Sequence, residues 1–248
     1  MDLVSVIIPY YKKRYFIKET IISVINQSYK NLEVLVIFDD NNINDYEYLK
    51  EIGKLDNRIK ILKNDRNLGA GFSRNLGILK SVGKYIAFLD ADDTWGTDKL
   101  KDQISFMNKN DYKISHTSYY IINEKKKIIG HRKARNLLSI NEVLKSCDIG
   151  LSTVIIEKSI IIKNKIEFPK IKTKEDFVFW LMLFKKEHKF YGYDKYLTNW
   201  TDAKNSLSSS VIQKLSDGFK VYYHYMNFNI FKSIYFLLCL SLNYLKKK

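Results

Sequence analysis

Two hydrophobic patterns alternate along the first 110 residues. Continuous apolar runs typical of buried strands occupy residues 4–9, 32–38, 58–63 and 85–90. Apolar residues at helical spacing follow these runs, over residues 17–25, 45–54, 69–82 and 100–107. The helix predicted over 69–82 carries Phe72, Leu76 and Leu79 on one face. Strands alternating with helices predict an α/β fold with a mainly parallel sheet, flanked by helices on both faces.

The pattern is less regular beyond residue 110. Strands are predicted over residues 112–122, 125–132 and 152–158. The first two of them are expected to pair as a hairpin, and an apolar helix with an acidic start is predicted over 174–186. No Pro-, Gly- or Ser-rich linker divides the chain. We therefore expect one domain over residues 1–205, followed by a C-terminal helical extension over 206–248.

Cysteine usage and charge narrow the compartment and the partners. The two cysteines, Cys147 and Cys239, are too few and too far apart for a disulfide framework or a metal cluster, which favours the reducing cytoplasm. The formal net charge of +15 predicts an anionic partner: nucleic acid, an acidic membrane surface or a phosphorylated small molecule. Because lysines are scattered along the chain, a compositional bias explains the excess equally well.

Aromatic and acidic residues follow three of the predicted strands. They are Tyr10 and Tyr11, then Asp39 and Asp40, then Asp90, Asp92 and Asp93. Ligands of open α/β sheets bind beyond the carboxyl ends of the strands, so we expect these residues to meet at one edge. Carboxylates there suit Mg²⁺ or Mn²⁺, which keeps coordination sites for phosphate oxygens. The pattern indicates a nucleoside diphosphate bound with a divalent cation; for any single cluster, a solvated turn is the alternative.

Four segments resemble a bacterial family 2 glycosyltransferase with the GT-A (Rossmann-like) fold. They are "VSVIIPYYKK", "SVINQSYKNLEVLVIFDD", "NLGAGFSRNLGILKSVGKYIAFLDADDTW" and "KTKEDFVFWLML". The resemblance covers roughly residues 3–208. It implies a nucleotide-sugar-binding half over about 1–110 and an acceptor-binding half over 111–205. It also implies metal-dependent transfer of a sugar, with inversion, from a nucleotide donor, a UDP-sugar being the expected one. The expected acceptor is a hydroxyl of a glycan or lipid-linked acceptor in the synthesis of a surface polysaccharide or lipooligosaccharide.

The resemblance also implies roles for single residues. The expected donor-binding positions are Pro9, Tyr11, Asp39, Asp40, Asn67, Arg74, Asp90, Ala91 and Asp92. Arg74 is expected among them because it stands in "NLGAGFSRN", near the start of a predicted helix, where backbone amides can meet an anion. Tyr11 would face the nucleobase, and either Asp39 or Asp40, depending on register, would bond the base or the ribose. Asp90 would lie nearer the ribose and Asp92 would contact the metal. Asn67 holds a loop in place or contacts the donor, and Asp93 assists or caps the following turn.

The acceptor side rests on the segment "KEDF". Its Asp176 matches the general base, which takes the proton of the acceptor hydroxyl, and Glu175 is the second candidate. His116 and Trp200 are weaker candidates for acceptor or loop contacts. Lys204 is a candidate to replace an arginine of the family. Three basic residues either bind a phosphate of the acceptor or are solvated, namely His131, Arg132 and Arg135.

The C-terminal segment "FNIFKSIYFLLCLSLNYLKKK" is apolar without interruption only over about 234–242, too short to span a bilayer. Two interpretations stay open: a helix on an anionic membrane surface, or a helix docked on the protein's own core. The first implies a lipid-linked acceptor and a peripheral place on the inner face of the cytoplasmic membrane. Two alternative functions also stay open, a nucleotidyltransferase that makes nucleotide sugars and a basic nucleic-acid-binding protein; the leading hypothesis expects no nucleic acid partner.

Overall fold

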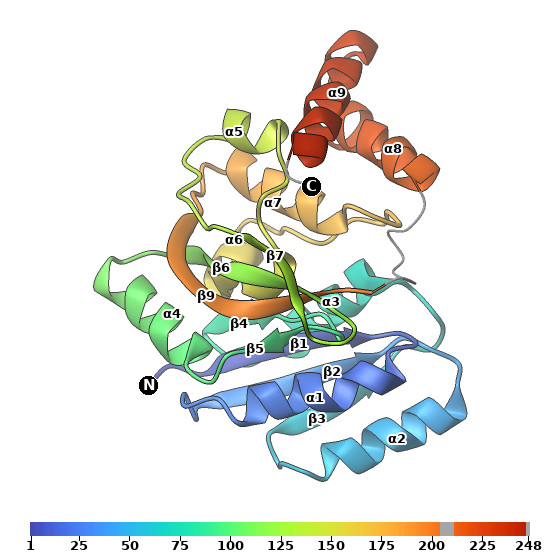
Figure 1. Cartoon of the computed structure of the whole chain (residues 1–248), viewed down its shortest axis with the longest axis vertical. Helices are drawn as coiled ribbons and strands as arrows, with labels where there is room; N and C mark the ends of the chain where they lie inside the picture. Colours follow the sequence, from blue (N-terminus) through green and yellow to red (C-terminus); the bar gives the residue numbers. More distant parts are fainter. Residues whose placement is uncertain (204–210, 247–248) are drawn as a thin grey trace.

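In the computed structural model, which describes residues 1–203 and 211–246, nine strands form one sheet (Figure 1). Their order is β3-β2-β1-β4-β8-β6-β9-β5, and β7 pairs with β6 off this path. The strands are β1 Val4–Tyr10, β2 Leu32–Phe38, β3 Ile59–Lys63, β4 Tyr85–Phe88, β5 Thr94–Trp95, β6 Ile114–Asn123, β7 Ile128–Arg132, β8 Ile155–Glu157 and β9 Tyr191–Asp202. The helices are α1 Arg14–Ile25, α2 Ile43–Gly53, α3 Ala70–Lys80, α4 Lys99–Lys109, α5 Ile140–Leu144, η1 Leu151–Thr153, α6 Lys158–Lys163, α7 Glu175–Lys185, α8 Val211–Lys220, η2 Val221–Tyr225 and α9 Ile230–Lys246.

Strands β1 to β4 form a parallel unit, with β1 between β2 and β4 and with β3 beside β2. Every residue of β1, β2 and β4 is buried. Successive side chains of a strand point to opposite faces, so Val6 and Ile8 pack in a cluster with α1, α2 and α4, while Ile7 packs in another with α3 and α7. The predicted α/β fold with helices on both faces of a parallel sheet is confirmed.

The sheet changes character beyond β4, because β8 pairs antiparallel with both β4 and β6. Strand β6 also pairs antiparallel with β7 and parallel with β9, which curves along it (Figure 1). The predicted hairpin of β6 and β7 is confirmed. Strand β9 was not predicted, because "YGYDKYLTNWTD" mixes polar and aromatic residues and contains no continuous apolar run. Its long pairing with β6 is a tertiary contact that no local sequence pattern predicts.

The apolar face predicted for α3 is largely exposed. Phe72 is 39% and Leu79 is 73% exposed, whereas Gly71 and Gly77 are buried. A Cβ at Gly77 would lie 2.5 Å from Cγ2 of Ile7, so the helix approaches β1 more closely than a larger residue permits. Close packing of small residues, rather than the spacing of large apolar ones, sets which face of α3 meets the sheet.

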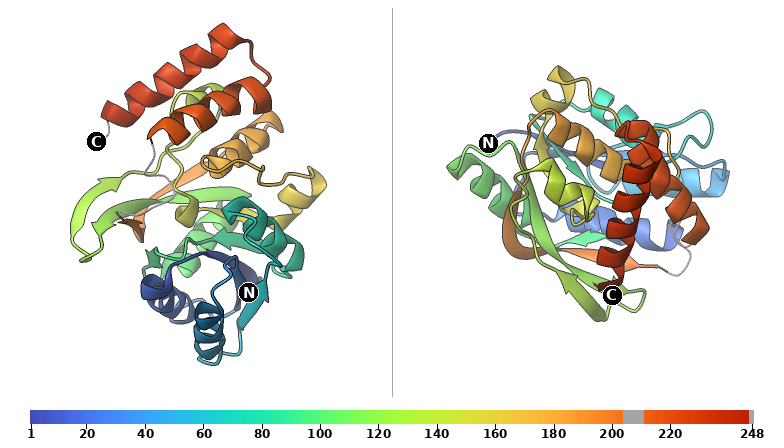
Figure 2. Two further views of the ribbon diagram at one scale, coloured as in Figure 1. Left: turned by 90° about the vertical axis from the view of Figure 1, so that its right-hand side faces the viewer. Right: turned by 90° about the horizontal axis from the view of Figure 1, so that it is seen from above.

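Helices α8 and α9 lie at the end of the molecule opposite α1 and α2 (Figures 1 and 2). Tyr222, Phe236 and Leu240 are buried in the core cluster, and Tyr222 Oη donates to the carbonyl of Leu144 at 2.7 Å. The segment therefore docks on the protein's own core. The outward face of α9 still exposes apolar side chains, namely Ile230, Phe231, Ile234, Tyr235, Leu238, Leu242, Tyr244 and Leu245. Neither described range, 1–203 or 211–246, contains a helix long and apolar enough to cross a membrane.

Candidate active site

A cavity of about 780 Å³ opens at the carboxyl ends of β1, β2 and β4, and the starts of α3 and α7 close it. Ligands of α/β sheets bind at this edge. The predicted residues in its lining are Pro9, Tyr11, Asp39, Asn67, Arg74, Asp90, Ala91, Asp92, Glu175 and Asp176. The described lining does not contain the other candidates, namely Asp40, Asp93, His116, His131, Arg132, Arg135 and Trp200. The tertiary structure thus brings together candidates from both halves of the sequence.

Asp92 is held by a lysine from the loop after β1. Lys13 Nζ donates to Asp92 Oδ2 at 2.6 Å, and both side chains are partly buried. Burial raises the pKa of Asp92; the Lys13 charge opposes this shift and the charge of Asp90 adds to it. The pair forms because β1 and β4 are neighbouring parallel strands whose ends open onto the same edge.

Asp93 has a structural role. It is buried, its Oδ2 accepts from Ser152 Oγ at 2.5 Å, and its Oδ1 accepts from the backbone N–H of Thr201 at 2.8 Å. Burial and the charges of Asp92 and Asp90 raise its pKa well above the ordinary value. Asp93 therefore ties the loop after β4 to η1 and β9.

The residues of the cavity fit a cation shared with a diphosphate better than a preformed metal cage. Within residues 1–203 and 211–246, no three His, Cys, Asp or Glu side chains converge as a ligand set. Of the two aspartates, Asp92 could turn to a cation more readily, since its partner is the flexible side chain of Lys13, whereas Asp90 is held by a buried arginine. Mg²⁺ and Mn²⁺ commonly take one or two carboxylates and complete their coordination with phosphate oxygens and water.

Arg74 joins the donor side of the cavity to the start of α7. Its Nη2 donates to Asp90 Oδ1 and its Nη1 to Glu175 Oε1, each at 2.7 Å. The guanidinium is buried, and it lies 5.4 Å from the ring centroid of Phe168. Burial alone lowers the pKa of Arg74, but the charges of Asp90 and Glu175 more than offset this and raise it. Because Glu175 is engaged with Arg74, it is less suited than Asp176 to act as a base.

Asp176 stands in the first turn of α7 and faces the cavity. Its Oδ1 accepts from the backbone N–H of Phe177 at 2.7 Å. Burial and the neighbouring charge of Glu175 raise the pKa of Asp176 to about 6, against the lowering effects of Arg74 and Lys174. A carboxylate with this pKa is ionised at neutral pH and accepts a proton more readily than an ordinary aspartate.

Asp39 organises the loop that precedes α3. Its Oδ1 accepts from Asn64 Nδ2 at 2.7 Å and from the backbone N–H of Leu68 at 2.8 Å, while Oδ2 accepts from the N–H of Gly69 at 2.7 Å. Asn67 Nδ2 donates to the carbonyl of Asp39 at 2.9 Å. Gly69 has a φ of +90°, a conformation that favours glycine. Asp39 and Asn67 both line the cavity and both hold this loop in place.

Asp40 faces a different loop. It is buried, and its carboxylate accepts from the backbone N–H groups of Lys12 at 3.2 Å and Asn41 at 2.7 Å. Of the two registers considered for the acidic pair after β2, the cavity lining contains Asp39.

His116 and Trp200 lie away from the cavity. His116 is buried in β6, and its Nε2 donates to the carbonyl of Arg135 at 2.9 Å. Burial lowers the pKa of His116 to about 4, so the ring is neutral at pH 7. Trp200 stands in β9 opposite Ile121 of β6 and is 38% exposed. Lys204 lies outside the described residues.

Sequence reasoning missed two groups that shape the site. One is Lys13, for which a signal existed: a basic segment follows β1 and an acidic one follows β4, and both end at the same sheet edge. The other is Asp217 of α8, whose Oδ2 accepts from the N–H of Thr173 at 3.1 Å and from Thr173 Oγ1 at 2.9 Å. Thr173 lines the cavity. No local pattern links positions 173 and 217.

Comparison with known families identifies the chain. The protein-family model described as "Glycosyl transferase family 2" matches residues 5–198 of the sequence. The chain belongs to glycosyl transferase family 2. Membership in this family supports the glycosyltransferase hypothesis over the nucleotidyltransferase alternative.

This family 2 glycosyltransferase has relatives that match most of its length. TuaG of Bacillus subtilis, which is named as a teichuronic acid biosynthesis glycosyltransferase, is 31% identical over 99% of this chain and 97% of its own. The protein WfgD of Escherichia coli is 39% identical over 74% of this chain and 70% of its own. It is named as a UDP-Glc:alpha-D-GlcNAc-diphosphoundecaprenol beta-1,3-glucosyltransferase.

Solved structures share the fold of this family 2 glycosyltransferase. TarS 1–349 of S. aureus, in complex with UDP-GlcNAc, superposes with a TM-score of 0.75 and 20% identity, over 96% of this chain and 70% of that one. The mannosyltransferase PcManGT of Pyrobaculum calidifontis, in complex with GDP-Man and Mn²⁺, has a TM-score of 0.68 and 12% identity, over 91% of this chain and 64% of that one. The GT-A fold predicted from the sequence is thereby confirmed.

Proposed function

We propose that this glycosyltransferase moves a sugar, with inversion, from a nucleoside diphosphate sugar to a hydroxyl of a lipid-linked glycan during surface polysaccharide synthesis. The observation that carries the proposal is one cavity lined by both Asp92 and Asp176. A UDP-sugar is the expected donor, since TarS with UDP-GlcNAc has the same fold and WfgD is named for UDP-Glc. The name of WfgD also supports a lipid-linked acceptor.

We assign the donor to the half formed by residues 1–110 and the acceptor to residues 111–205, with 206–248 as an extension. Tyr11 packs against the base, and the first turn of α3, which follows the loop held by Asp39, offers backbone N–H groups to the donor. Lys13 leaves Asp92 when the donor binds and pairs with a phosphate, because an anion then lies within its reach. Asp92 holds a divalent cation, Mg²⁺ or Mn²⁺. When bound, this cation offsets the negative charge that builds on the departing diphosphate.

Asp176 acts as the general base. It takes the proton of the acceptor hydroxyl while the hydroxyl oxygen forms its bond to the anomeric carbon. The bond between that carbon and the diphosphate oxygen breaks on the opposite side, so the configuration inverts. Arg74 is a positioning residue in this scheme. It holds Glu175 next to Asp176 and, through Asp90, keeps the start of α7 aligned with the end of β4.

We further propose that the protein works on the inner face of the cytoplasmic membrane. The outward face of α9 combines exposed apolar side chains with Lys232 and Lys246. An amphipathic helix of this kind suits the surface of an anionic bilayer. The net charge of +15 adds a general attraction to such a surface.

A two-part experiment tests the function. Nucleotide sugars are first screened for thermal stabilisation of the protein with Mn²⁺ and with EDTA; a donor raises the melting temperature only with the metal present. Transfer to a synthetic lipid-linked sugar is then followed, and the anomeric configuration of the product is read by NMR. Asp92→Ala is expected to abolish metal-dependent donor binding. Asp176→Asn is expected to keep donor binding and lose transfer, and the opposite pattern would reverse the two assignments.

A further inference from the structure

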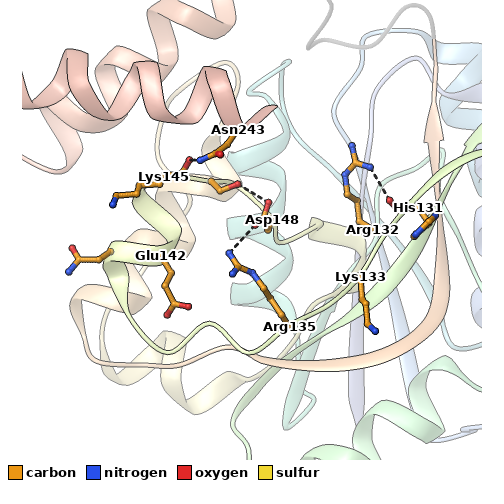
Figure 3. A pocket seen from close by; sticks show the side chains of 10 residues that line it. His131, Arg132, Lys133, Arg135, Glu142, Lys145, Asp148 and Asn243 are labelled. Atoms are coloured by element: carbon orange, nitrogen blue, oxygen red, sulfur yellow. Dashed lines mark hydrogen bonds and ion pairs between the residues drawn. The ribbon is translucent and has the colours of Figure 1, made fainter. Parts of the chain in front are cut away.

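A second cavity, of about 730 Å³, lies between the segment after β7, the region around α5 and the end of α9 (Figure 3). It shares no lining residue with the donor cavity within the described chain. Its basic side chains come from two segments of the chain, and they are Arg132, Lys133, Arg135 and Lys145. Nothing in the transfer scheme above uses these residues.

The carboxylates of this second cavity are already engaged. Glu142 Oε2 accepts from the backbone N–H groups of Leu138 at 3.1 Å and Ser139 at 3.0 Å. Asp148 Oδ1 accepts from Ser146 Oγ at 2.8 Å, and its Oδ2 lies 3.3 Å from Arg135 (Figure 3). The lining has four basic and two acidic residues, and one of the basic residues, Lys133, also pairs with Asp194 outside the lining at 2.9 Å. A positive charge remains in the cavity. This charge selects an anionic ligand.

The backbone that presents the basic groups is held in place. His116 donates to the carbonyl of Arg135, and Gly192 packs so closely that a Cβ there would lie 2.6 Å from the Arg135 backbone nitrogen. On the other wall, Asn243 of α9 donates from Nδ2 to the carbonyl of Lys145 at 2.8 Å. The side chain of Lys145 is exposed, and it forms no ion pair with any residue that the structure describes. The cations therefore stand on a defined frame rather than on a mobile loop.

The position of this cavity relates it to both the donor site and the membrane face. Asp148 lines the second cavity and Leu151 lines the donor cavity. Three residues span at most about 10 Å, so the Cα atoms of these two lining residues lie no farther apart than that. On the other side, Asn243 lies between Leu242 and Tyr244, which are 57% and 56% exposed on the outward face of α9.

We propose that the second cavity binds the diphosphate of a lipid-linked acceptor, an inference that rests on the proposed function. Lys145 and Arg135 donate charge-assisted hydrogen bonds to the phosphate oxygens. The sugar on the diphosphate extends past residues 148–151 into the donor cavity, where its hydroxyl meets Asp176. The lipid chain leaves the cavity along the exposed apolar side chains of α9 and enters the bilayer.

Isothermal titration with geranyl diphosphate, a soluble short-chain prenyl diphosphate, tests this assignment on the full-length protein saturated with UDP and Mn²⁺. The wild type is expected to bind the probe without releasing UDP. Lys145→Gln and Arg135→Gln are each expected to weaken binding about tenfold. Lys145→Arg keeps the charge and retains binding. Lys109→Gln, the same change on the exposed surface of α4, is the matched control and leaves the affinity unaltered.

Three outcomes would overturn the proposal. The first is equal affinity of the wild type, Lys145→Gln and Arg135→Gln for the probe; the second is displacement of UDP by the probe. The third comes from vesicles of phosphatidylglycerol: if both variants lose vesicle binding as strongly as probe binding, the cavity holds membrane headgroups instead. Failure of the proposed function has a different signature, since the wild type then fails to bind any nucleotide with Mn²⁺ while probe binding stays sensitive to Lys145→Gln.

Discussion

Lys13 Nζ lies 2.6 Å from Asp92 Oδ2, although 79 residues separate the two in sequence. The ammonium occupies the carboxylate that we propose as the ligand of the cation. Replacing the lysine therefore removes a competitor of the metal. We expect Lys13→Gln to raise the affinity for Mn²⁺ in the absence of donor about threefold to tenfold. This factor corresponds to the loss of a partly buried ion pair that contributes about 1 kcal/mol.

Paramagnetic resonance of free Mn²⁺ measures this affinity. The same variant is expected to bind UDP more weakly, because the lysine pairs with phosphate in the donor complex. Lys54→Gln, which breaks the exposed pair with Glu51, serves as the control. An unchanged Mn²⁺ affinity in Lys13→Gln would show that the lysine does not compete with the metal.

The raised pKa of Asp176 predicts how transfer depends on pH. A general base works only in its ionised form, so the rate constant is expected to fall about tenfold per pH unit below the pKa of about 6 and to level off above it. Single-turnover rates between pH 5 and pH 8 test this. A profile whose acid limb lies near pH 4 would show that Asp176 titrates as an ordinary aspartate.

The same shift predicts a stability change. Because the folded pKa lies above the unfolded value, folding takes up a proton between roughly pH 4 and pH 6, and burial of the charged carboxylate costs stability at higher pH. Asp176→Asn is expected to stabilise the protein above pH 6 by up to about 3 kcal/mol and to have no effect of this kind below pH 4. Urea unfolding of both proteins at pH 4 and pH 7.5 gives the comparison.

Arg74 satisfies two carboxylates with one buried guanidinium, so its removal leaves both without their partner. Arg74→Ala is expected to lower the free energy of unfolding by about 3–5 kcal/mol, and Arg74→Lys by less, because an ammonium can pair with only one of the two at this geometry. Denaturant unfolding measures both. The surface variant Arg14→Ala, which breaks a more exposed pair with Asp45, is expected to cost about 1 kcal/mol or less. Equal losses in Arg74→Ala and Arg14→Ala would contradict the central role of the buried bridge.

Asp217 connects the C-terminal helices to the loop that ends at the candidate base. Asp217→Ala leaves the N–H and hydroxyl of Thr173 without this acceptor, at a cost of about 1–3 kcal/mol. We expect slower transfer and faster amide hydrogen exchange of residues 170–176, with unchanged affinity for UDP. Asp217→Asn keeps one acceptor oxygen and is expected to retain most activity. If exchange in this segment stays the same in Asp217→Ala, the loop does not depend on α8.

The exposed face of α9 predicts binding to anionic vesicles. Because Tyr222, Phe236 and Leu240 belong to the core, removing the whole segment would damage the fold, and surface substitutions are the sharper test. Leu238→Gln with Leu242→Gln is expected to weaken sedimentation with phosphatidylglycerol vesicles at least about tenfold. Leu79→Gln, an equally polar change at an exposed leucine of α3, is the control. Equal sedimentation of the two variants would exclude α9 as the membrane face.

The sequence alone predicted the strands that build the site and the residues at their ends. Buried parallel strands are continuous apolar runs, so β1, β2 and β4 are visible as local patterns, and the rule that ligands meet the carboxyl ends of such strands placed Tyr11, Asp39 and Asp92 at one edge. The start of α7 was predicted from an acidic turn before an apolar helix, whereas the place of Asp176 at the site was predicted from the family resemblance.

Only the tertiary structure decided which of these groups meet. Arg74 and Glu175 form an ion pair although they are 101 residues apart in sequence. Strand β9 pairs with β6 in a register that its mixed polar and aromatic composition does not predict. His116 was a candidate for the acceptor side, but it is buried in β6, where its ring donates to the carbonyl of Arg135. Local periodicity depends on near neighbours along the chain, whereas ion pairs, buried hydrogen bonds and the facing side of a helix depend on which surfaces the fold brings into contact. Those contacts determine the charge and the base strength at the site.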